Sequence, residues 1–152
     1  MNKLRMYYAG SIRGPQGDNV PPSLHAQRIE DGIKGKQRLQ HILDRHIAIK
    51  EIEWSILCPH EYEDVFLGAW TAGLITSAQI IDFWCNMIAR TCDIICLSTD
   101  PQESQGVGQE LVAAQKHGLY VWELYKYPAD QWEDYIWTQI PGLWQLYLPH
   151  AI

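Results

Sequence analysis

Short apolar runs alternate along the chain with longer stretches in which apolar residues recur every three or four positions. The short runs predict strands at 4–9, 52–58, 93–98 and 119–124. The longer stretches predict helices at 24–47, 63–74, 78–90, 106–117 and 129–139. Strands that alternate with helices in this way predict a single α/β domain, with a Rossmann-like parallel sheet flanked by helices on both faces. Ligands of such domains bind at the carboxyl ends of the strands.

Prolines, glycines and a capping serine refine the boundaries of these strands and helices. The segment 14–23 contains three prolines and two glycines, which predicts a long loop after the first strand. Ser23 is the expected N-cap of the helix that follows, and Gly32 and Gly35 weaken that helix. Gly118 stands where a glycine closes the helix at 106–117.

Composition narrows the class of protein. The chain has 152 residues, 47% hydrophobic and 20% charged, which suits one globular domain with a sizeable core. A net charge of −6 argues against a general nucleic-acid binder, which needs clustered Lys and Arg. No apolar run is long enough to span a membrane and no signal peptide begins the chain, so we expect a cytoplasmic protein. The four cysteines lack ligand spacing, which predicts reduced thiols and no metal site. We also expect no cofactor.

Two glycine-rich loops carry the candidate chemistry, one after the first strand and one before the helix at 106–117. Parallel strands bring both loops to one edge of the sheet, where backbone N–H groups, hydroxyls and a guanidinium can bind an anion. The predicted anion-binding residues are Gly10, Ser11, Ile12, Arg13, Gly14, Ser104, Gly106 and Gly108. Each loop alone is also consistent with an ordinary turn, Arg13 with a surface charge, and Glu110 with a solvated residue in the first turn of its helix.

Taken together, the segments YYAGSIRG and SQGVGQEL resemble the nucleoside 2-deoxyribosyltransferase superfamily, and most closely its 2′-deoxynucleoside 5′-phosphate N-hydrolase branch. The resemblance covers about two-thirds of the chain. The segments 14–23 and 58–77 look longer than in those hydrolases and more like small phage and bacterial relatives.

The resemblance implies a role for each matching residue. Glu110 is the expected nucleophile at the anomeric carbon, and Tyr7 is the expected hydrogen-bond partner near that carboxylate. The two loops bind the substrate's 5′-phosphate. The family's second acid falls on Cys85 here, so Asp82, one turn earlier, is the candidate; the alternative is an exposed helix carboxylate. Apart from the resemblance, His60 follows a strand end and is expected to cap a turn; the alternative is that it lines the same edge of the sheet.

The leading hypothesis is an enzyme that hydrolyses the N-glycosidic bond of a (deoxy)nucleoside 5′-monophosphate. A deoxyribosyltransferase that exchanges bases is the closest rival, but Arg13 favours a phosphorylated substrate. A nucleotide-binding or sequestering protein without turnover remains a third alternative because the second acid is doubtful.

Nine of the 17 aromatic residues lie between Tyr120 and Tyr147, and the family resemblance implies dimers with shared active sites. We therefore expect a homodimer. The alternative is that these rings, those of Trp122, Trp132, Trp137 and Trp144 among them, pack internally against the helix at 24–47.

Overall fold

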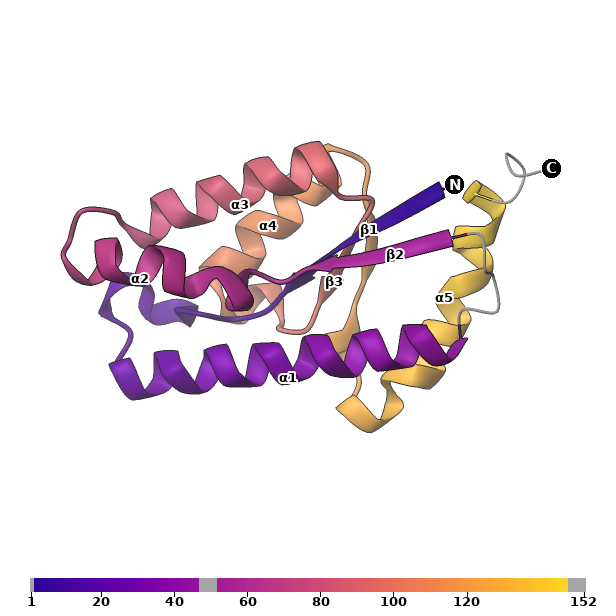
Figure 1. Cartoon of the computed structure of the whole chain (residues 1–152), viewed down its shortest axis with the longest axis horizontal. Helices are drawn as coiled ribbons and strands as arrows, with labels where there is room; N and C mark the ends of the chain where they lie inside the picture. Colours follow the sequence, from indigo (N-terminus) through magenta and orange to yellow (C-terminus); the bar gives the residue numbers. More distant parts are fainter. Residues whose placement is uncertain (1, 47–51, 148–152) are drawn as a thin grey trace.

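The computed structural model describes residues 2–46 and 52–147 of the chain (Figure 1). Within them, four strands form one parallel sheet in the order β2-β1-β3-β4. The strands are β1 (Asn2–Ala9), β2 (Ile52–Leu57), β3 (Ile94–Leu97) and β4 (Tyr120–Trp122). The α-helices are α1 (Pro22–His46), α2 (Glu63–Thr71), α3 (Ser77–Thr91), α4 (Gln105–Lys116) and α5 (Trp132–Tyr147). Short 3₁₀ helices are η1 (Gly14–Asn19), η2 (Pro59–Tyr62), η3 (Pro101–Glu103), η4 (Leu124–Lys126) and η5 (Ala129–Gln131).

The predicted α/β class is confirmed, because helices cover both faces of the parallel sheet (Figure 1). Alternate residues of β1 point to opposite faces, as strand geometry requires. Leu4, Met6 and Tyr8 pack in the cluster that includes residues of α1 and α5. Tyr7 and Ala9 pack in the cluster formed with α3 and α4. Burial of this central strand on both faces explains why its second half, residues 6–9, is continuously apolar.

Several predicted boundaries are wrong by a few residues. Pro22 begins α1, so Ser23 lies inside the first turn and is not the N-cap. Proline suits the first helical position, because an N–H group there would have no acceptor within the helix and its absence costs no hydrogen bond. The predicted loop at 14–23 contains η1, which Gly17 interrupts with φ 57°. Ile47, the last residue predicted for the first helix, lies outside the described residues.

The glycines of α1 prove to be packing residues. A Cβ on Gly32 would lie 2.0 Å from His60, and one on Gly35 would lie 1.9 Å from the Tyr8 hydroxyl. The absence of both side chains therefore lets α1 lie close to the sheet. The packing gained in this way offsets the low helix propensity of glycine.

Other helices end with common capping interactions. Thr76 and Gln79 form a capping box at the start of α3. Gly118 adopts φ 73° directly after α4, as predicted for a closing glycine. Across the described part of the chain, no helix has both the length and the apolar character that a membrane crossing needs.

Candidate active site

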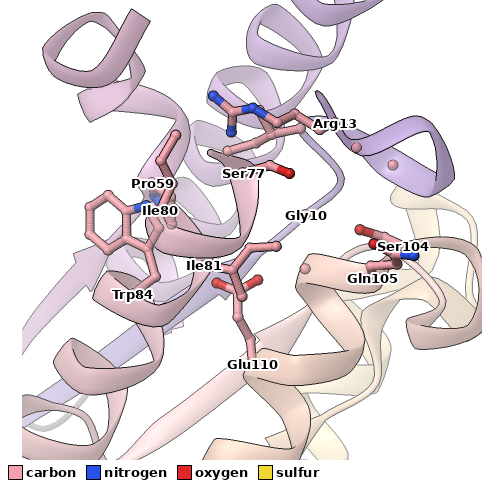
Figure 2. Close-up of a pocket in the computed structure, with 14 residues that line it drawn as sticks. Gly10, Arg13, Pro59, Ser77, Ile80, Ile81, Trp84, Ser104, Gln105 and Glu110 are labelled. Carbon is pink, nitrogen blue, oxygen red and sulfur yellow. The ribbon is translucent and has the colours of Figure 1, made fainter. Parts of the chain in front are cut away.

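The two predicted loops meet where the direction of the chain across the sheet reverses. The chain passes from β1 to β2 on one side and later crosses to β3 on the other. The ends of β1 and β3 are in register at Ala9 and Leu97, and the Ser98 amide donates to the Ala9 carbonyl oxygen at 2.8 Å. Such a switch point opens a crevice at the carboxyl ends of the strands. A pocket lies there, lined by residues of the loop after β1, of α3 and of the start of α4, and we call it the first pocket (Figure 2).

Glu110 is buried at this switch point, 6% exposed, although a residue near a helix start is usually solvated. The buried face of α4 contains Val107, Glu110 and Ala114 at helical spacing, which turns Glu110 toward the sheet. The Tyr7 hydroxyl of β1 donates a hydrogen bond to Glu110 Oε2. Burial raises the pKa of Glu110 well above the ordinary value of a glutamate. The sequence-based expectation that Tyr7 lies beside this carboxylate therefore agrees with the geometry.

The start of α4 forms one wall of the pocket. Ser104 is the N-cap and accepts from the Val107 amide at 3.4 Å. Ser104, Gln105 and Gly106 line the pocket, and a Cβ on Gly106 would meet only ordinary contacts, with Ile81 at 3.5 Å. Gly106 is thus not required by the packing of the protein itself. Its missing side chain leaves backbone and helix dipole open to the pocket.

Helix α3 supplies the opposite wall with Ser77, Ile80, Ile81 and Trp84. Figure 2 shows Glu110 at one end of the pocket and Arg13 at the other, with Ser77 and Ile81 between them. The enclosed volume is about 40 Å³, enough for a few water molecules. A nucleotide can therefore enter only if side chains along this wall move.

Arg13 lines the pocket but its charge is already balanced. Its guanidinium, 7% exposed, forms an ion pair with Glu63, the first residue of α2. His25 Nε2 lies 3.1 Å from the same Glu63 oxygen. Burial lowers the pKa of Arg13 while Glu63 raises it. Arg13 is therefore neither a surface charge nor an isolated anion-binding group, and its Nε has no hydrogen-bond partner among the described residues.

Aromatic stacking fixes this ion pair in place. The Arg13 guanidinium carbon lies 4.4 Å from the centroid of the Trp70 ring, and the His25 ring stacks on the same tryptophan at 5.2 Å. Asp18 accepts from Trp70 Nε1 at 2.8 Å and from the Ser77 amide at 2.7 Å. These two bonds lower the pKa of Asp18. Through Asp18, these bonds connect η1 with α2 and α3 at the Arg13 end of the pocket.

The other predicted residues divide between several places. Gly10, Ile12 and Gly14 line the first pocket, whereas Ser11 lines a second cavity on the far side of Gly10. Gly108 does not line the first pocket and lies against η3, where a Cβ would be 3.1 Å from the Pro101 carbonyl oxygen.

Asp82 is exposed on α3 and does not line the pocket, although Ile81 and Trp84, one and two positions away, do. No carboxylate besides Glu110 is among its lining residues in the described chain.

Sequence reasoning missed Glu63, His25 and Trp70 as the groups that hold Arg13. None belongs to a glycine motif, and Glu63 and Trp70 lie in the segment 58–77, where the resemblance gave no guidance. His60, in η2, lines the second cavity at the sheet edge, which is one of the two places expected for it. The residue is buried, its Nε2 lies 3.4 Å from the Ser11 carbonyl oxygen, and burial lowers its pKa to about 4.

Three comparisons, with protein-family models, with curated proteins and with solved structures, found no match for this chain. The functional proposal is therefore carried by the residues themselves and by the resemblance of the two glycine-rich segments.

Proposed function

We propose that this chain hydrolyses the N-glycosidic bond of a (deoxy)nucleoside 5′-monophosphate, with Glu110 as the nucleophile. One observation carries the proposal: a buried glutamate, held by the Tyr7 hydroxyl, lines a pocket at the switch point of a parallel sheet. Buried, desolvated carboxylates in clefts are frequently functional, because their desolvation has to be maintained by the fold.

The chemistry follows from the two oxygens of Glu110. Tyr7 occupies Oε2, so Oε1 is the oxygen left to bond to C1′ of the sugar. That bond forms as the C1′–N bond breaks; the electron pair of the C1′–N bond passes to the base nitrogen, and the base takes up a proton from solvent water as it leaves. A water molecule then bonds to C1′ and gives up a proton to the solvent, the ester bond between C1′ and Glu110 breaks, and the sugar phosphate leaves with retained configuration. A carboxylate in a water-poor pocket also stabilises the positive charge that develops at C1′.

The far end of the pocket suits the 5′-phosphate. Gly106 and Gln105 present the start of α4, and Arg13 contributes guanidinium donors that Glu63 does not use. A phosphate there would share Arg13 with Glu63, so Glu63 weakens phosphate binding in this proposal.

The protonation state of the Glu110 carboxyl group determines the pH dependence of the proposed reaction. Only the ionised carboxylate can attack, and burial raises the pKa of Glu110. We expect kcat/KM to rise with pH as Glu110 ionises.

The direct test is release of free base from deoxynucleoside and ribonucleoside 5′-monophosphates, followed by chromatography. Glu110→Gln should abolish release. Glu103→Gln, the same change at an exposed carboxylate of η3, should leave it intact. No base release by the unaltered protein from any common monophosphate, or equal release by Glu110→Gln, contradicts the proposal. Adding a second free base in the same assay tests exchange, the transferase alternative.

A second experiment tests the role of Arg13 and Glu63. Glu63→Gln removes one negative charge beside Arg13 while its amide oxygen can still accept a hydrogen bond, so monophosphate affinity should rise by about tenfold. Asp64→Asn, the same charge change at the exposed next residue, should have a much smaller effect. Binding of the matching nucleoside should not change. Equal effects of the two substitutions would mean that Arg13 does not contact the phosphate.

A non-catalytic nucleotide-binding function is the second candidate, because Asp82 is exposed and the described residues that line the pocket include no second acid to protonate the leaving base. Tight binding of a monophosphate without base release would favour it.

We also propose a cytoplasmic homodimer with shared active sites. Trp122 and Trp132 pack internally, 0% and 6% exposed, but Trp137 is 49% exposed on α5. Exposed apolar side chains also occur on α2 and α3, including Val65 at 74% and Phe83 at 46%.

A further inference from the structure

A second and larger cavity lies on the other side of Gly10 from Glu110. Its volume is about 390 Å³, against about 40 Å³ for the first pocket. Its walls come from α1, from the carboxyl ends of β1 and β3, and from Ala129 and Trp132 near the start of α5. Gly10 lines both cavities, so the loop after β1 separates them. The proposed reaction does not use this space.

Positive charge concentrates along one wall of this cavity. Arg28, Lys34 and Arg38 line it from one side of α1, against one carboxylate, Asp31. Lys34 pairs with Glu30 at 2.9 Å in an exposed pair of the kind that contributes little. Arg38 has no ion pair within residues 2–46 and 52–147. Three cations around one cavity are notable in a chain of net charge −6 and favour an anionic ligand.

The opposite wall offers hydroxyl groups. Ser11, Ser98 and Thr99 line it at the ends of β1 and β3. The Ser11 amide donates to Thr99 Oγ1 at 3.0 Å, while the buried Ser11 Oγ has no partner among the described residues. A buried hydroxyl without a partner costs free energy unless a ligand or water satisfies it. Hydroxyls together with the Asp31 carboxylate suit a ligand that has hydroxyl groups of its own.

We propose that this cavity is a second ligand site, which binds a sugar phosphate. The phosphate lies against Lys34 and Arg38, and the sugar hydroxyls lie toward Ser11, Thr99 and Asp31. The volume is within the range of small-molecule sites. This assignment does not depend on the proposed hydrolysis, since none of these groups is needed for base release.

Binding in the second cavity affects the first pocket through the loop that the two share. Gly10 and Ser11 begin the loop that carries Arg13, so a sugar phosphate beside Ser11 contacts the same loop from behind. We therefore expect binding at one site to change the affinity of the other, and such coupling is reciprocal.

The test is a titration of the isotopically labelled full chain with ribose 5-phosphate, followed by amide NMR signals. Signals of Gly32, Gly35 and Thr99, which line the second cavity, should shift and report its affinity. The double substitution Lys34→Gln with Arg38→Gln should raise Kd about tenfold or more, because charge-assisted hydrogen bonds are lost. Arg90→Gln, the same change at an exposed cation of α3, should leave Kd unchanged.

Four outcomes would overturn the assignment. They are an absence of shifts at these three residues, an affinity that the double substitution does not weaken, and shifts confined to Gly17 and Gly106, which line the first pocket. The fourth is equal affinity for inorganic phosphate or for ribose, which would mean that the cavity does not recognise a sugar phosphate. Base release is not measured, so failure here is distinct from failure of the proposed hydrolysis.

Discussion

Replacing Glu110 by glutamine should stabilise the protein increasingly as the pH rises. Glu110 is 6% exposed, and within the described residues its side chain has one hydrogen bond, from Tyr7. Burial without a neighbouring cation disfavours the ionised form and raises the pKa of Glu110 well above its ordinary value. The folded state therefore retains a proton that the unfolded state releases.

The sign and the size of the effect follow from proton linkage. A group whose pKa is raised on folding contributes stability below its unfolded pKa, about 4.3 for glutamate, and loses it as the pH rises through the folded pKa. Within that window the free energy of unfolding falls by up to about 1.4 kcal/mol per pH unit. Glutamine keeps the size of the side chain, and its amide oxygen still accepts the Tyr7 hydroxyl. Two pH units in the window thus separate the two proteins by roughly 2.7 kcal/mol, a large part of a typical stability.

Urea denaturation of both proteins at several pH values between about 5 and 8 measures this difference. Glu103→Gln is the matched control, because the same chemical change at an exposed carboxylate should leave the pH profile unaltered. His60 titrates in the opposite sense: burial lowers its pKa to about 4, so its contribution is lost as the pH falls. It is common to all three proteins and cancels in the comparison. Parallel profiles for Glu110→Gln and the unaltered protein would refute the desolvated state of Glu110.

Four further expectations can be checked by standard measurements. Gly35→Ala should destabilise the fold by about 1–3 kcal/mol in urea denaturation, because its Cβ would lie 1.9 Å from the Tyr8 hydroxyl, whereas Gly68→Ala in α2, with nothing within 4 Å, should be neutral or stabilising. Gly106→Ala should fold normally yet weaken monophosphate binding in calorimetry, because its Cβ meets only ordinary contacts but projects beside the pocket. The ring of His60 should remain neutral in an NMR titration down to about pH 5, and a midpoint near 6.5 would contradict its burial. Light scattering at micromolar concentration should give a dimer mass, and a monomer mass would remove the shared active site.

The sequence predicted the sheet and the helices well because the signal there is local. A buried central strand has to be apolar on both sides, and Leu4, Tyr7 and Tyr8 meet that requirement within one short run. Boundaries were less accurate because competing caps are equivalent in sequence. Ser23 is a good N-cap by chemistry, but Pro22 already starts α1 one residue earlier.

The loops at the sheet edge were predictable for a geometric reason. Parallel strands end at a common edge, and β1 and β3 are neighbours in the sheet, so the segments after them meet, and the structure brings Glu110 and Tyr7 together there. Asp82 shows the limit of such placement. Its helix packs as expected, but one residue of rotation separates an exposed position from Ile81, which lines the pocket.

The charge of the site could not be predicted from the motif that contains Arg13. A guanidinium between two glycines indicates an anion site, because the loop supplies both shape and positive charge. The charge, however, is a property of the whole neighbourhood, and Glu63 approaches Arg13 from 50 positions further along the chain. Glu63, His25 and Trp70 share no periodicity or spacing with the loop and come together only when α1 and α2 pack against it. A glycine-rich loop thus predicts where an anion can bind, while the residues packed behind its arginine determine how strongly it is attracted.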